Sequence, residues 1–228
     1  PGAAAGEPGS GMVARRVWAG PEGASALSSD GRYLSHVDWS TGNLALRDLV
    51  TGEARPLTHK SSGQESGEFA VSSVFSPDDR QVVYTWYSKD QSYDLRLIGL
   101  DGSAPRILYR NEEAGYPEPR AWSPDGKYIL ATFSRNDRTN QIGLVAVADG
   151  SVRILKTLDW RYPGGISLFS DGRYVVYGFA PQEDSNAHDI FVLSTDGSRE
   201  IPLVQHPAND VRPIWAPDGN RIVFASDR

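Results

Sequence analysis

Short apolar runs alternate with turn residues along most of the chain. The clearest case is the turn Ser-Pro-Asp-Gly at 123–126, followed by the apolar run 128–133. Pro124 presets φ for the first central position, Asp125 can bond the nearby backbone, and Gly126 can adopt a conformation that a side chain resists. The pattern therefore predicts a strand, a tight turn and a second strand.

The same turn recurs at nearly constant intervals of 46–48 residues, marked by Asp30, Asp78, Asp125, Asp171 and Asp218. A second series of turns runs in step with it, at 51–52, 101–102, 149–150 and 196–197. Two turns per period predict four strands, named a to d in chain order. In the third period we expect them at about 119–123, 127–134, 141–147 and 151–157. A period of this length and strand content is typical of a propeller blade.

Strand b is apolar on both faces in most periods. In the third period Ile129, Ala131 and Phe133 face one way, and Leu130 faces the other. Such a strand must be covered on both sides, which sheets packed radially achieve. The sequence thus predicts an all-β fold, a β-propeller of four-stranded antiparallel blades with about five repeats visible, the last incomplete. The expected blades are 24–58, 69–110, 117–157, 164–204 and a partial one at 211–228.

The two ends of the sequence differ from the repeats. Residues 1–11 are rich in Gly, Ala and Pro and are expected to be a flexible lead or an expression remnant. Residues 12–18 resemble the d strands. The sequence stops at Arg228, after strand b of the fifth repeat, so we expect the natural protein to continue; a complete short ring is the alternative. An open blade edge would allow self-association.

Composition narrows the function classes. The chain has no cysteine, which excludes disulfides and thiolate chemistry, and its net charge of −6 without a basic stripe gives no footprint for nucleic acid. No apolar run approaches the roughly 20 residues that span a bilayer, so we expect no membrane insertion. The sequence holds no Gly-x-Ser-x-Gly elbow and no His-Glu-x-x-His, which predicts a non-catalytic chain without a cofactor or metal.

The repeats resemble those of a known family. Phe75-Ser-Pro-Asp, Trp122-Ser-Pro-Asp-Gly-Lys, Trp215-Ala-Pro-Asp-Gly and the closing run 222–228 are similar to the WD40-like repeats of TolB-type β-propellers. The resemblance implies a bacterial protein and favours a periplasmic or extracellular location, with a cytoplasmic one left open. Ser29 and Ser170 replace the proline of the motif, and Asp79 replaces its glycine.

The resemblance leaves three functions open. The leading hypothesis is a non-catalytic scaffold that binds a protein or peptide. The second is the gating propeller of a serine peptidase related to prolyl oligopeptidase or dipeptidyl peptidase, whose hydrolase domain lies outside this sequence. The third is a sensor domain of a larger bacterial kinase or regulator.

The b–c and d–a connections vary in length and sequence and lie on one side of a propeller, where binding is expected. Aromatic and Arg side chains are typical anchors of such a surface. Strand aromatics could instead wedge between blades. The candidate binding residues are Trp39, Trp86, Tyr87, Tyr116, Asp159, Arg161, Tyr162, Asp210 and Arg212. Of the four histidines, His36 is expected in the core, and His59, His188 and His206 in solvated loops.

Overall fold

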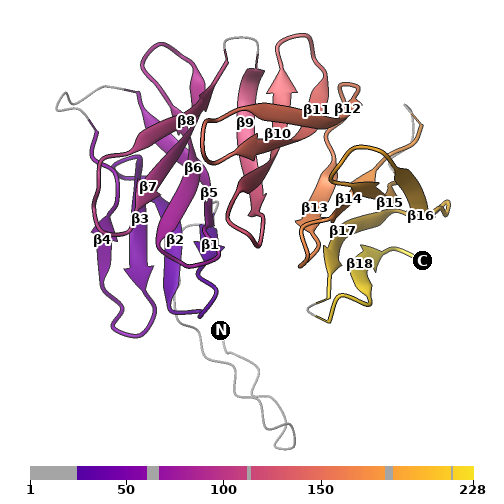
Figure 1. The fold of residues 1–228 in the computed structure, drawn as a ribbon, viewed down its shortest axis with the longest axis horizontal. Coiled ribbons are helices and arrows are strands. Elements are labelled where there is room, and N and C mark those ends of the chain that lie inside the picture. Colours follow the sequence, from indigo (N-terminus) through magenta and orange to yellow (C-terminus); the bar gives the residue numbers. More distant parts are fainter. Residues whose placement is uncertain (1–24, 61–66, 112–113, 183–186, 217) are drawn as a thin grey trace, which may run out of the picture.

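The structure is a computed structural model that describes residues 25–60, 67–111, 114–182, 187–216 and 218–228. These residues form antiparallel sheets, four of them four-stranded and one two-stranded. Figure 1 shows the sheets side by side in chain order along an open arc, which leads from the indigo strands to the yellow ones. Each sheet is one predicted blade, so the all-β propeller fold with an incomplete last repeat is confirmed.

The strand bounds follow the repeat. Blade 1 contains β1 (Ser25–Leu27), β2 (Tyr33–Asp38), β3 (Asn43–Asp48) and β4 (Ala54–Pro56). Blade 2 contains β5 (Phe69–Phe75), β6 (Gln81–Tyr87), β7 (Tyr93–Gly99) and β8 (Arg106–Arg110). Blade 3 contains β9 (Ala114–Trp122), β10 (Tyr128–Arg135), β11 (Asn140–Ala146) and β12 (Val152–Leu158). Blade 4 contains β13 (Gly164–Leu168), β14 (Tyr174–Phe179), β15 (Asp189–Ser194) and β16 (Glu200–Val204), and blade 5 contains β17 (Asp210–Trp215) and β18 (Ile222–Ser226).

The predicted start of β9 is wrong by five residues. The repeat pattern predicts that this strand begins at about residue 119, yet Ala114 already pairs with Arg135, so Pro117 and Pro119 lie within the strand. Strand β9 is the inner strand of its blade and pairs on one side only, with β10. Prolines are tolerated in such an edge strand because the unpaired side needs no N–H donor. Tyr116 consequently lies in a strand and not in a loop.

The a–b turns of blades 1 to 3 share one set of hydrogen bonds. In blade 3 the Ser123 hydroxyl donates to Asp125 Oδ1 at 2.7 Å and accepts the Tyr128 N–H at 2.9 Å, while the Lys127 N–H donates to Asp125 Oδ1 at 3.1 Å. Gly126 closes the turn with a φ of 74°. The corresponding serines of blades 1 and 2 make the same bonds. Blades 4 and 5 keep the Asp but have Phe169 and Ala216 in place of the serine.

Two departures from the repeat motif compensate each other. Asp79, at the glycine position of blade 2, has a φ of 55° and directs its carboxylate to the a–b turn of blade 1. There it accepts the Ser29 backbone N–H at 2.9 Å and the Ser29 hydroxyl at 2.5 Å. A proline at position 29 would have no N–H to donate. The two unusual residues therefore form one contact between neighbouring blades.

The core lies between the blades and not within any one of them. One cluster of buried side chains joins blades 1 and 2, a second joins blades 2 and 3, and a third joins blades 3 and 4. In blade 3, Ile129, Ala131 and Phe133 pack toward blade 2, and Leu130 packs toward blade 4. This arrangement confirms the prediction that strand b is covered on both faces, and it explains why one blade could not bury its apolar residues alone.

The outer strands add polar contacts between blades. The Arg55 guanidinium of β4 donates to the Leu100 carbonyl of blade 2 at 2.5 Å, and Arg106 of β8 donates to the Val147 carbonyl of blade 3 at 2.6 Å. Each of these carbonyls follows strand c of the next blade. The outer strands of blades 1 and 2 are therefore bonded to the next blade at the same place.

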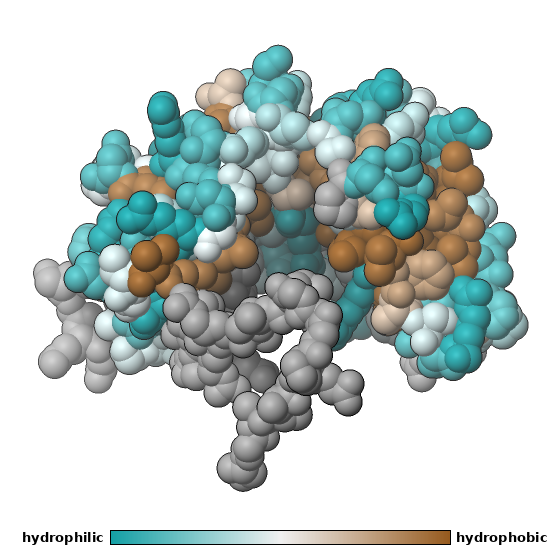
Figure 2. Space-filling view, turned by 90° about the horizontal axis from the view of Figure 1, so that it is seen from below, coloured by the Kyte–Doolittle hydropathy of each residue, from teal (hydrophilic) through white to brown (hydrophobic). Residues whose placement is uncertain are grey.

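Blade 5 ends the arc with two strands. Within the described residues β18 pairs only with β17, so its outer edge carries no third strand. Val223 and Ile214 are 55% exposed there. Figure 2, which looks into the open side of the arc, shows hydrophobic side chains gathered on the side of the C-terminal strands, across a hollow from the N-terminal blades. The expected lead at 1–11 and the d-like segment 12–18 lie outside the described residues.

Candidate binding face

The b–c turns have similar backbones but different side chains. In blade 3 the Arg135 N–H donates to the Thr139 carbonyl and the Arg138 N–H donates to the Arg135 carbonyl. The same bonds close the turn 88–92 of blade 2. Arg138 and Gln91 occupy equivalent positions with φ of 67° and 64°, a left-handed conformation that favours glycine. Both turns therefore carry a side chain where glycine would be less strained.

A buried acid fixes the loop end of blade 2. The Asp94 carboxylate is fully buried and accepts from Arg110 Nη2 and Arg96 Nη2, each at 2.8 Å, and from the Ser88 hydroxyl at 3.2 Å. Burial alone would raise the pKa of Asp94, but hydrogen bonds from Arg110 and Arg96 outweigh it and hold the pKa below its usual value. These contacts join the b–c turn to strand d.

In blade 3 a buried amide holds the loop end of the blade. Asn140 Nδ2 donates to three successive backbone carbonyls of the connection that leads into blade 4, those of Asp159, Trp160 and Arg161, at 3.0–3.3 Å. In blade 4 the buried Asp189 instead accepts a backbone N–H, that of His206, at 3.2 Å. The loop end of blade 3 therefore has an amide, which can donate to backbone carbonyls. Blades 2 and 4 have a carboxylate, which can accept from N–H groups.

The predicted loop tyrosines bridge neighbouring blades. The Tyr162 hydroxyl lies 2.8 Å from Thr132 Oγ1 of blade 3 and donates to Glu118 at 2.6 Å, and Arg120 donates to the same hydroxyl. Burial, with the Glu118 charge adding to it, raises the pKa of Tyr162 to about 12. Tyr116 stands 46 residues earlier and packs edge-on against Tyr93 of blade 2, with ring centroids 5.1 Å apart. Burial likewise raises the pKa of Tyr116 to about 12.

The other predicted aromatics divide between surface and core. Trp39 is 49% exposed at the end of β2 and packs against Phe69, and Tyr87 contacts Phe69 and Tyr93 in a continuous row of rings. Trp86 is 4% exposed and lies in the core between blades 1 and 2, as the wedge interpretation expects. Trp39 is thus the predicted tryptophan that a partner could reach.

The predicted charged residues are mostly paired within the protein. Arg161 Nε donates to both Asp159 oxygens and Nη1 donates to the Ala180 carbonyl. The Arg161 hydrogen bonds hold the pKa of Asp159 below its usual range. Asp210 is buried in β17, where it pairs with Arg228 at 3.0 Å. Burial alone would raise the pKa of Asp210, but hydrogen bonds from Ser226 and Arg228 keep it lowered. Arg212 is exposed in the same strand, so these two candidates lie in β17 and not in a connection between blades.

The sequence interpretation missed Trp160, which is 57% exposed on this face. The sequence does contain a signal for this residue, in the comparison between repeats. Tyr162 has an aromatic equivalent one repeat earlier, at Tyr116, whereas the positions that correspond to Trp160 are Ala114 and Pro207. An aromatic residue outside the repeat pattern is not needed for packing between blades.

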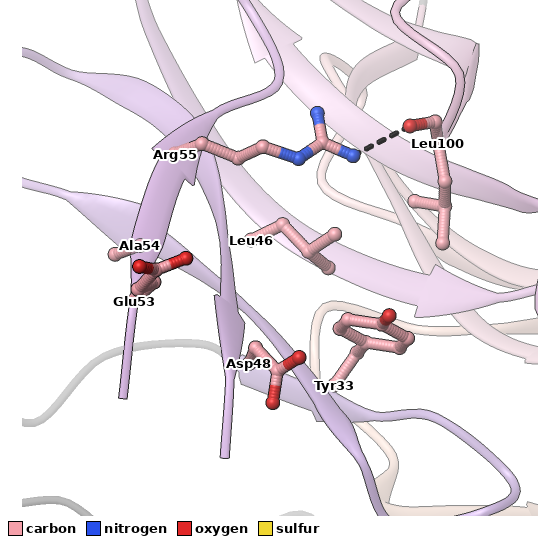
Figure 3. Close-up of a pocket in the computed structure, with 7 residues that line it drawn as sticks. All are labelled: Tyr33, Leu46, Asp48, Glu53, Ala54, Arg55 and Leu100. Atoms are coloured by element: carbon pink, nitrogen blue, oxygen red, sulfur yellow. Dashed lines mark hydrogen bonds between the residues drawn. The ribbon is translucent and has the colours of Figure 1, made fainter. Parts of the chain in front are cut away.

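A cavity of about 580 Å³ lies away from this face, at the outer edge of blades 1 and 2. Figure 3 shows Arg55 reaching across to the Leu100 carbonyl, with Leu46 below the guanidinium and with Tyr33 and the Asp48 carboxylate lower still. Asp48 already accepts from Arg32 at 2.9 Å and from two turn N–H groups. The pocket is therefore built largely from groups that the rim and the c–d turn use.

The histidines do not form a group. His36 is 9% exposed, as expected for a core residue, and burial lowers its pKa. His188 is partly buried against Asn209 and so is less solvated than predicted. Across the described ranges no three or more His, Cys, Asp or Glu side chains gather as metal ligands, and no helix there could cross a membrane.

Comparisons with known proteins agree with the fold. No family model matches the chain. It is 34% identical to the Tol-Pal system protein TolB of Anaeromyxobacter dehalogenans over 124 residues, 54% of this chain and 27% of that protein. It is 23% identical over 207 residues, 91% of this chain and 28% of the relative, to a Bacillus subtilis protein named uncharacterized peptidase YuxL. The solved structure of a putative TolB from Agrobacterium tumefaciens matches with a TM-score of 0.72 at 22% identity, over 93% of this chain and 73% of that chain.

The four-stranded radial sheets and their repeated turns define a β-propeller. The chain has the fold of TolB-type propellers and is similar to a TolB protein in sequence over about half of its length. It spans only about a quarter of the length of the two curated relatives.

Proposed function

We propose that this propeller is a non-catalytic scaffold that binds a protein or peptide partner on the face formed by its b–c and d–a connections, called the loop face below. One observation carries the proposal. Of the five tryptophans in the described residues, the two that are exposed, Trp39 and Trp160, both lie on the loop face. Tryptophan is enriched among the residues that dominate binding energy at protein interfaces.

The similarity to TolB proteins supports a protein partner in general terms, because those relatives are named as parts of the Tol-Pal system. The same resemblance favours a periplasmic location. The loop face also fits the role physically, because its backbone is held by buried groups such as Asp94 and Asn140. A surface that is ordered before binding loses less entropy when the partner docks.

The test is a selection of displayed peptides against the chain, followed by hydrogen-exchange mapping of the best synthetic peptide. We expect peptides to be enriched and to protect backbone amides on the loop face. Failure to enrich any peptide, or protection confined to the a–b and c–d turns, would contradict the proposal.

A second candidate is the gating propeller of a peptidase, favoured by the similarity to YuxL over most of this chain. It predicts a Gly-x-Ser-x-Gly segment elsewhere in the natural protein. Peptide hydrolysis by the natural protein that disappears when that serine is replaced would place this candidate first. The scaffold proposal is wrong if the chain alone hydrolyses peptides, esters or glycosides and loop-face substitutions abolish the activity.

A further inference from the structure

Trp160 and Arg138 form one corner of the loop face on blade 3. Trp160 is the more exposed of the two surface tryptophans, and Arg138 lies at the tip of the b–c turn beside it. Two concavities of about 430 and 310 Å³ adjoin the indole, and both are lined by Arg138, Thr139 and Trp160. A side chain of a partner could therefore settle against the indole on either side.

The backbone that presents Trp160 is held from below. Asn140 binds the Trp160 carbonyl at 3.0 Å and the carbonyls on both sides of it. The next residue, Arg161, is fixed to Asp159 and to the Ala180 carbonyl, and its guanidinium lies 4.7 Å from the Phe179 ring centre. The indole is thus presented by an ordered segment, although its own ring packs on no other aromatic ring of the described residues.

The charge of this corner is positive. Asp137 lies 3.6 Å from Arg135, and Asp159 is paired with Arg161, so both carboxylates are neutralised locally. Arg138 makes no ion pair with any described residue and is left as an available cation. A guanidinium prefers a carboxylate, which it can bind with two parallel hydrogen bonds.

Arg138 also occupies a position that costs stability. Its φ of 67° is left-handed, and a side chain is disfavoured there relative to glycine. Residues held in such conformations often serve binding or catalysis. Gln91 has the same conformation at the equivalent position of blade 2, so the left-handed backbone belongs to the turn, and the guanidinium is what distinguishes this corner.

We propose that the Trp160–Arg138 corner binds a peptide segment in which a carboxylate side chain adjoins an apolar or aromatic one. The apolar group packs on the indole and the carboxylate pairs with Arg138. This inference rests on the proposed function and specifies the chemistry of the partner.

The experiment is an NMR titration of the indole N–H signals of the labelled chain, with Trp160 assigned through a Trp160→Phe variant. The probe is a capped pentapeptide with phenylalanine between two glutamates, and its control has lysines in place of the glutamates. We expect the glutamate peptide to shift the Trp160 signal and to bind at least tenfold more tightly than the lysine peptide, with an affinity that falls as salt is raised.

Arg138→Gly gives the sharper test. We expect it to weaken binding about fivefold and yet raise the midpoint of thermal unfolding by about 2–4 °C, because the left-handed position is relieved. Gln91→Gly, at the equivalent position of blade 2, is the matched control and should raise the midpoint similarly without changing the affinity.

Several outcomes overturn this inference. They are equal binding of the two peptides, an unmoved Trp160 signal, an Arg138→Gly variant that binds as well as the parent, or a shift caused by a uronic-acid oligosaccharide but not by the peptide. If selected peptides protect other parts of the loop face while Trp160 stays unmoved, the scaffold function stands and this site is wrong. If no peptide binds anywhere, both fail.

Discussion

The two faces of the propeller are held by different kinds of contact. On the turn face, the a–b turns of blades 1 to 3 repeat the same bonds among a serine, an aspartate and nearby N–H groups. On the loop face, blades 2 to 4 each satisfy a buried Asn or Asp in a different way, as the arginines around Asp94 and the carbonyls around Asn140 show. Local contacts produce uniform turns, whereas contacts between distant residues allow each loop to differ.

The difference indicates how such a fold separates stability from function. A turn that depends on residues within five positions can be copied from blade to blade without regard to its neighbours. A loop anchored by a residue 16 to 21 positions away can change its surface residues as long as the anchor finds partners. Variation is therefore concentrated on the loop face, where we place the partner.

The largest expected effect comes from removing a loop-face anchor. Asp94→Ala should lower the free energy of unfolding by about 3 kcal/mol, because it leaves two arginines facing a buried site without their carboxylate. Chemical denaturation measures the loss. Asp101→Asn, an exposed turn carboxylate of the same blade, is the control and should change stability by less than about 0.5 kcal/mol. A similar loss in both variants would remove the distinction between the faces.

Lowering the pH should remove the stability that Asp94 contributes. The pKa of Asp94 is held below the ordinary value of 3.8, so its contribution to stability is present above pH 3.8 and is lost as the pH falls through the lowered value. Asp94→Asn should therefore be less stable than the parent at neutral pH, and the gap should narrow below pH 3.8. Denaturation curves from pH 7 to pH 2 measure it, and a gap that stays constant with pH would contradict the assignment.

A single turn should matter less than an anchor. Ser123→Ala removes the hydroxyl that links Asp125 to the Tyr128 N–H and should lower the free energy of unfolding by about 1 kcal/mol. Ala216→Ser places the same hydroxyl in blade 5, where it is naturally absent, and should raise thermal stability slightly. If neither substitution has an effect, the repeated serine is not a stabilising part of the turn.

The smallest effect concerns the contact between turns of blades 1 and 2. Ser29→Pro should destabilise the parent, because the N–H that binds Asp79 is lost, but should be neutral or stabilising in an Asp79→Gly background. A double-mutant cycle should give a coupling of about 0.5–1 kcal/mol. Additive effects would mean that the two departures from the motif are unrelated.

The sequence by itself determined the repeat, the four-stranded blades and the position of the turns, because these depend on residues close together in the chain. Turn chemistry at Pro124, Asp125 and Gly126 and the two-faced apolar strand at 128–133 were sufficient. The closing strands of blade 5 were also predicted to lack an outer partner, and β18 shows that edge among the described residues.

Only the tertiary structure decided which side chains of the loop face are available to a binding partner. Tyr162 and Trp160 are two residues apart and both aromatic, yet the Tyr162 hydroxyl bonds Thr132 of the neighbouring blade and the residue is 38% exposed, against 57% for Trp160. The sequence predicts Asp210 as a binding residue, but in β17 it is buried and forms an ion pair with Arg228, 18 positions away. The early start of β9 also depends on the tertiary structure, because Pro117 and Pro119 are acceptable only where a strand has an unpaired edge, and pairing is a property of the whole sheet.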